Sequence, residues 1–139
     1  MVQRLVNISI LSIFIIMFNM CNFSLSQYEY IYIGEYEINM EKCVTMYPDF
    51  DTMKYANLKL KIKPDHSYET SKTFHRITST TGNWYLKRVD VAVWCHLVSI
   101  NNIETQIGMD SDKNLMIFIG TRMIGVIRDP IYIYLKKIE

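Results

Sequence analysis

Apolar and polar residues alternate along much of the chain after residue 27, which is the pattern of β-strands with one buried face. The clearest example is residues 58–63, where leucine and isoleucine alternate with three lysines. Pro64 to Ser67 then has turn composition, with proline presetting the first central position, and Tyr68 to Arg76 returns as a second strand. Residues 57–76 are therefore expected to form a hairpin.

Further short segments of strand character follow one another to the C-terminus. Leu115 to Ile119 is apolar throughout, which predicts burial on both faces, and the sequence Arg128-Asp129-Pro130 predicts a turn between the last two strands. Residues 39–53 fit no period and are expected to form a long loop or a short helix. Besides the hairpin, the expected strands are residues 28–36 with a bend at Gly34, 84–88, 91–97, 103–109, 115–119, 122–127 and 131–137.

The number and spacing of these strands indicate an all-β fold. About eight short strands with turns at intervals of roughly ten residues are typical of an antiparallel barrel or sandwich. A closed barrel leaves no unpaired edge in a chain rich in tyrosine, isoleucine and valine. We therefore predict a small antiparallel up-and-down barrel of about eight strands, with a β-sandwich as the alternative.

The first 26 residues have the order of regions found in a secretory signal peptide. Arg4 precedes an apolar run from Leu5 to Phe18, and a small-residue stretch ends at Ser26. Cleavage after Ser26 would leave residues 27–139 as a single domain, exported to the periplasm or secreted. Two alternatives are a retained membrane anchor and a membrane-anchored lipoprotein acylated at Cys21, although bulky Met20 precedes that cysteine.

The charge of the expected mature chain is balanced. The full sequence has 15 basic and 14 acidic residues, and the first 26 residues contain Arg4 and no acidic residue. Nucleic acids and anionic membranes select proteins with a basic surface. The sequence therefore predicts no nucleic-acid partner, and a membrane partner only if Cys21 is lipidated or the N-terminal segment is retained.

Two cysteines, Cys43 and Cys95, remain after the expected cleavage. In an oxidising compartment a pair of cysteines can form one disulfide, so a Cys43–Cys95 bridge is predicted. The alternative is that each thiol is a small buried apolar group.

Four short motifs carry a resemblance to a known class of proteins. They are Gly34-Glu35-Tyr36, Leu60 to Glu69, Gly82-Asn83-Trp84 and Tyr134 to Ile138. In this order they resemble small exported bacterial proteins of lipocalin-like type, although His66 stands where their turn usually has glycine. The resemblance implies a small antiparallel barrel and transfers no catalytic or ligand-binding residue.

The sequence contains no recognisable catalytic motif. It lacks a nucleophile elbow and a glycine-rich phosphate loop, and its three histidines show no metal-ligand spacing. A composite site of Cys43, His75 and His96 is conceivable, but Cys95 and His96 are adjacent in a strand and point to opposite faces. We therefore predict no catalytic residues, no metal and no cofactor.

Aromatic residues are the best candidates for a binding site. Phe74, Trp84 and Trp94 are predicted to line an apolar pocket of the kind that small barrels hold in their mouths, and the alternative is that they fill the core. If Val93 and Cys95 face the core, Trp94 faces outward.

These observations predict an exported, non-enzymatic β-domain that binds a small apolar ligand or an envelope protein. The alternative is a protein-interaction or structural module with a solid core. A third, less favoured hypothesis is a hydrolase whose site is assembled from unlinked carboxylates and histidines.

Overall fold

The computed structural model describes residues 27–138. The predicted signal peptide, with its alternative lipidation site at Cys21, lies outside the described residues. Of the described residues, 27–31 belong to one compact unit, and the chain from Tyr32 onward belongs to another, which contains the eight strands.

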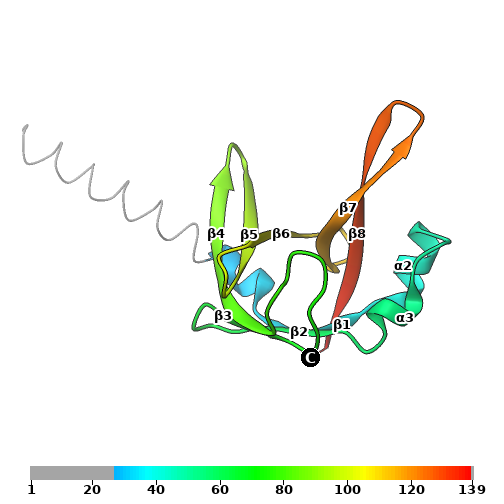
Figure 1. Ribbon diagram of the computed structural model, residues 1–139. Helices are drawn as coiled ribbons and strands as arrows, with labels where there is room; N and C mark the ends of the chain where they lie inside the picture. Colours follow the sequence, from blue (N-terminus) through cyan, green and yellow to red (C-terminus); the bar gives the residue numbers. More distant parts are fainter. Residues whose placement is uncertain (1–26, 139) are drawn as a thin grey trace, which may run out of the picture. The chain divides into compact units, whose positions relative to one another are not determined.

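The second unit is a closed barrel in which each strand pairs antiparallel with the next, and the last pairs with the first (Figure 1). This confirms the predicted up-and-down barrel over the sandwich. The strands are β1 (Gly34–Ile38), β2 (Lys59–Ile62), β3 (Ser67–Thr70), β4 (Thr81–Val89), β5 (Ala92–Ser99), β6 (Glu104–Met109), β7 (Leu115–Ile124) and β8 (Ile127–Ile138).

Large apolar side chains fill the inside of the barrel. In each strand alternate residues point inward, as the pleat of a strand requires. The pairing places Trp84 opposite Leu97 and Ile117 opposite Ile133, and all four side chains are buried. The largest fully buried side chains are Trp84, Tyr36, Tyr68, Leu58, Leu60, Ile62, Ile77, Leu97, Ile107, Leu115, Ile117 and Ile133.

Two hairpins, β4–β5 and β7–β8, are longer than the strands beside them. β4 and β5 are paired up to Val89 and Ala92, and β7 and β8 are paired up to Ile124 and Ile127. Both hairpins extend beyond their neighbours and project in the same direction in Figure 1. Their two-residue turns are Asp90-Val91 and Gly125-Val126.

The turn predicted at Arg128-Asp129-Pro130 is therefore wrong. These residues lie inside β8, where Pro130 pairs with Thr121 of β7. Proline is tolerated there because β1 pairs with β8 only from Leu135 to Ile138, which leaves the other edge of β8 unpaired at residue 130.

The strand expected at residues 28–33 is also corrected. Residues 27–32 are helical, and the first strand begins at Gly34. Alternating tyrosines match the period of a strand, but a strand also needs a neighbour, and β1 pairs with β2 and β8 only from Gly34 to Ile38.

The aperiodic stretch after β1, expected to be a long loop or a short helix, contains two short helices. α2 spans Met40–Met46 and α3 spans Thr52–Tyr55. Asn39 and Asp51 cap them by accepting hydrogen bonds from the backbone N–H of Lys42 and Lys54. α2 packs against β8.

The predicted disulfide does not form, and both cysteines are free and buried. Cys43 lies on α2, where its thiol accepts a hydrogen bond from the N–H of Tyr134 at 3.3 Å and faces the carbonyl of the same residue. Cys95 points into the barrel from β5. Each thiol is therefore a small buried group, as the alternative to the bridge predicted.

Candidate functional site

The candidate site lies on the outer face of the barrel, where β5, β6, β7 and β8 are adjacent. Pairing of Cys95 with Ile107 and of Ile107 with Ile117 directs those three residues inward. Their neighbours in sequence point outward, because side chains alternate along a strand. The outward residues include Trp94, Met116 and Phe118, which are large, apolar and only partly buried.

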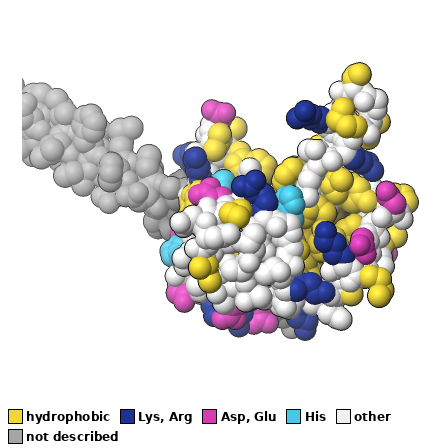
Figure 2. All heavy atoms as spheres, viewed as in Figure 1, with side chains coloured by type: hydrophobic (Ala, Val, Ile, Leu, Met, Phe, Trp, Pro, Cys, Tyr) yellow, Lys and Arg dark blue, Asp and Glu magenta, His cyan; other side chains and the backbone are white. Residues whose placement is uncertain are grey.

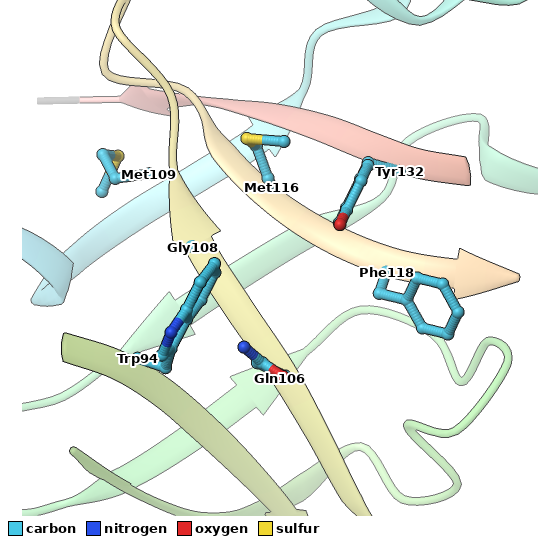
Figure 3. Close-up of a pocket in the computed structure, with 7 residues that line it drawn as sticks. All are labelled: Trp94, Gln106, Gly108, Met109, Met116, Phe118 and Tyr132. Atoms are coloured by element: carbon cyan, nitrogen blue, oxygen red, sulfur yellow. The ribbon is translucent and has the colours of Figure 1, made fainter. Parts of the chain in front are cut away.

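These side chains enclose a pocket of about 310 Å³. Trp94 and Gln106 face Met116, Phe118 and Tyr132 across it (Figure 3). This volume is at the lower end of the range of ligand pockets, which are mostly apolar with a few polar groups. None of the lining residues carries a charge: they are Trp94, Gln106, Gly108, Met109, Met116, Phe118 and Tyr132.

Gly108 allows Trp94 to lie close against the sheet. A Cβ atom at position 108 would meet Cζ3 of the indole at 3.0 Å. Any other residue would therefore push the ring outward into the pocket. The glycine and the tryptophan together form one wall of the pocket, in the way that an aromatic ring covers a glycine on a neighbouring strand.

The opposite wall is a set of aromatic edges. Phe118 and Tyr132 pair across β7 and β8, with ring centroids 6.0 Å apart in a T-shaped arrangement. The ring of His75 also lies edge to face with Phe118, with centroids 6.1 Å apart. Such pairs hold rings in place, so this wall is preformed.

A polar cluster lies beside the pocket on the outer face of β4, β5 and β6. Tyr85 stacks on His96 with centroids 5.0 Å apart, and its hydroxyl donates to Glu104 at 2.9 Å. Glu104 also lies 3.7 Å from Nδ1 of His96. Burial lowers the pKa of His96 and outweighs the opposing effect of Glu104, while burial and then Glu104 raise the pKa of Tyr85.

The three aromatic residues proposed from the sequence do not form one site. Phe74 is buried in the loop between β3 and β4, against Tyr55. Trp84 fills the barrel interior, and its Nε1–H donates to the carbonyl of Lys63 at 2.8 Å. Only Trp94 lines the outer pocket, on the face expected for it once Cys95 faces the core.

The titratable groups considered from the sequence are dispersed. Cys43 is buried against the backbone of β8, whereas His75 lies beside Phe118 and His96 lies beside Tyr85, nearer the surface. Within residues 27–138 no three histidine, cysteine or acidic side chains are grouped closely enough to hold a metal ion.

Most of the pocket was not identified from the sequence. Gln106, Gly108, Met116, Phe118 and Tyr132 were not singled out as binding residues. A signal was present, because the uninterrupted apolar run 115–119 must place apolar side chains on both faces of its strand. The prediction that both faces are buried is wrong: Leu115 and Ile117 are in the core, whereas Met116 and Phe118 line an open pocket.

The fold and site define a closed eight-stranded antiparallel barrel with a filled interior and an apolar pocket on its outer face. Comparisons with protein-family models, with curated proteins and with solved structures found no match to this chain. In the part of the chain from residue 27 to 138, no helix has the length and apolar character needed to cross a membrane.

Proposed function

We propose that this protein is a non-enzymatic binding domain that holds a small apolar ligand in the outer pocket. The observation that carries the proposal is the uncharged wall of Trp94, Met116 and Phe118 around a preformed space. The resemblance to exported lipocalin-like proteins and the signal-peptide pattern support an exported location. The ligand site differs from a barrel mouth, since large side chains occupy the interior.

The chemistry of the lining favours a ligand with an apolar body and one polar group. Methionine and aromatic side chains contact apolar groups of varied shape. The exposed amide of Gln106 and the hydroxyl of Tyr132 are the two hydrogen-bonding side chains among the lining residues. A medium-length alcohol or acid, with its chain along Trp94 and its polar end near Gln106, has this chemistry.

The test is a titration of the full chain with the neutral fluorophore N-phenylnaphthylamine, followed by displacement with decanol. Phe118→Ala removes one wall, and Gly108→Val displaces Trp94 into the pocket. Each variant is expected to weaken binding about tenfold, which corresponds to about 1.4 kcal/mol. Lys59→Ala, on the exposed face of β2, is the matched control and should bind as the wild type does.

Binding that is equal in Phe118→Ala, Gly108→Val and the wild type would show that the probe binds elsewhere, and the proposal would be abandoned. Circular dichroism of each variant establishes that the barrel is intact. Backbone amide shifts at Trp94, Gln106 and Met116 during the titration would locate the probe independently of the mutations.

The filled interior also favours the second candidate, a protein-interaction module. In this case the same pocket receives an apolar side chain from an envelope protein, as partly exposed aromatic residues often do at interfaces. A photo-crosslinking residue at position 106 discriminates between the two, with position 59 as the control. Crosslinks to one protein from position 106 alone, together with no displacement by decanol, would favour the interaction module.

A further inference from the structure

The turns of the two long hairpins carry valine at positions that are normally polar. Val91 is 99% exposed and Val126 is 95% exposed. Two-residue hairpin turns usually contain glycine, asparagine or aspartate, which suit the backbone and the solvent. Here Asp90 and Gly125 occupy one position of each turn, and valine occupies the other.

Exposed apolar side chains continue from each turn into the adjoining strands. The hairpin tips, defined as residues 89–92 and 123–127, also expose Val89, Met123, Ile124 and Ile127. Other turns of the described chain differ in composition: the β2–β3 turn has Asp65 and His66, and the β6–β7 turn has Ser111, Asp112 and Lys113. The β5–β6 turn also exposes Ile100, but it is followed by two asparagines, so a group of several exposed apolar side chains distinguishes the two tips from these three turns.

Basic side chains lie directly behind both tips. Lys87 and Arg88 are exposed on β4, and Arg128 is exposed on β8 opposite Met123. Asp129 on the second hairpin is paired with Arg122 at 2.8 Å. Figure 2 shows basic groups on both projecting hairpins and apolar groups toward their ends, with an acidic group also at the end of the left one.

We propose that the two hairpin tips insert into the surface of an anionic lipid bilayer. Both hairpins project in the same direction in Figure 1, so one flat surface can receive both. A protein partner would need two separate pockets at a fixed spacing, whereas a fluid bilayer accommodates projecting apolar groups without matching pockets. The arginine and lysine side chains behind the tips match anionic headgroups.

This inference is consistent with the nearly balanced charge of the chain, which is formally +1 in total. The total charge describes the sum over all residues, whereas a bilayer meets only the face that approaches it. Asp90 lies in one tip, next to the basic residues Lys87 and Arg88 of the same hairpin, whereas Glu35 and Glu37 are paired with Lys61 and Lys136 away from the tips. Attraction over a distance of about 10 Å depends on the nearest charges at physiological salt.

The test adds one tryptophan to the full chain, by Val91→Trp or Val126→Trp, and uses vesicles containing brominated lipids that quench tryptophan in contact with acyl chains. The wild type, which contains Trp84 and Trp94, gives the background that is subtracted. Lys59→Trp, on β2, is the matched control. Quenching is expected at positions 91 and 126 on vesicles of phosphatidylglycerol and phosphatidylcholine, and not at position 59. Every protein carries the same N-terminal residues, so their contribution is common to all.

A second measurement is vesicle sedimentation of the double variant Val91→Glu/Val126→Glu. We expect a loss of about tenfold in binding to anionic vesicles, because charged groups at the tips oppose insertion. Phe118→Ala is expected to retain vesicle binding, so failure of the pocket and failure of the tips are distinguishable. The proposal is overturned if positions 91 and 126 are quenched no more than position 59, or if ultracentrifugation shows the tips joining two copies of the chain.

Discussion

Trp84 and Trp94 show that the environment of a residue depends on the face of its strand on which the side chain lies. They lie on neighbouring, paired strands, yet Trp84 faces the core opposite Leu97, and Trp94 faces outward opposite Lys87. Alternation of side chains along β4 and β5 decides this difference. Position in the pleat, and not residue type, therefore separates the core residue from the candidate binding residue.

Gly82 provides a prediction at the same scale. A Cβ atom there would collide with the carbonyl oxygen of Val98 and with the ring of Tyr68. Because a backbone atom cannot move aside, Gly82→Ala is expected to lower the free energy of unfolding by about 2 kcal/mol or more. Urea unfolding monitored by circular dichroism measures the change.

Gly108→Ala is the matched control for this prediction. Its added Cβ would meet only the edge of the Trp94 side chain, which can shift toward the solvent. A loss of stability in Gly108→Ala as large as that in Gly82→Ala would contradict the explanation.

At the scale of elements, the sequence identified most strands and misplaced several of their boundaries. The turn of the hairpin expected at 57–76 and the strand and turn at 103–114 agree with the structure, because alternation and turn residues are local signals. The second strand of that hairpin ends at Thr70 and not at Arg76, and the strands expected at 115–119 and 122–127 are parts of one strand, β7. The helix at 27–32 and the turn at Gly125-Val126 were missed, because they depend on which segments find a neighbour. The outer pocket was missed for the same reason, since its walls come from four strands.

The turn between β6 and β7 is joined to α2 by Asp110. Its carboxylate accepts hydrogen bonds from Lys42 at 2.6 Å and from the backbone N–H of Asn114 at 2.7 Å. Burial alone would raise the pKa of Asp110, but these bonds outweigh it and the pKa is lowered. The carboxylate is therefore held in its ionised form between the turn and the helix.

Asp110→Ala is expected to destabilise the domain by about 1–3 kcal/mol, because it leaves backbone donors of the turn without their acceptor. Asp112 also contacts Lys42 but is 72% exposed, so Asp112→Ala should change stability by about 0.5 kcal/mol or less. Thermal unfolding of both variants at neutral pH compares them. Equal losses would show that the ion pair, and not the turn, accounts for the effect.

At the scale of the whole molecule, two histidines couple stability to pH. Burial lowers the pKa of both His75 and His96 from 6.5, assisted by Arg76 and Lys54 near His75 and by Lys87 near His96. Protons bind the unfolded chain more readily than the folded one when the folded pKa is the lower. The two histidines therefore make their full contribution to stability above about pH 6.5, the ordinary pKa of histidine. That contribution is lost as the pH falls toward their lower pKa values in the folded state.

The expected result is a decline in the free energy of unfolding between pH 7 and pH 5, measured by urea unfolding at several pH values. The double variant His75→Gln/His96→Gln should show a shallower decline over the same interval. An unchanged slope would mean that other groups govern the acid sensitivity of the barrel.

The meeting of α2 with β8 has a consequence for solubility. Beyond the end of β1, the edge of β8 has no strand beside it, and the N–H groups of Tyr132 and Tyr134 donate instead to the hydroxyl of Tyr47 and the thiol of Cys43. Open strand edges are templates for pairing with other chains. α2 and the residue that follows it thus protect the protein from aggregation, because their side chains bind the N–H groups to which a strand of a second molecule would otherwise pair.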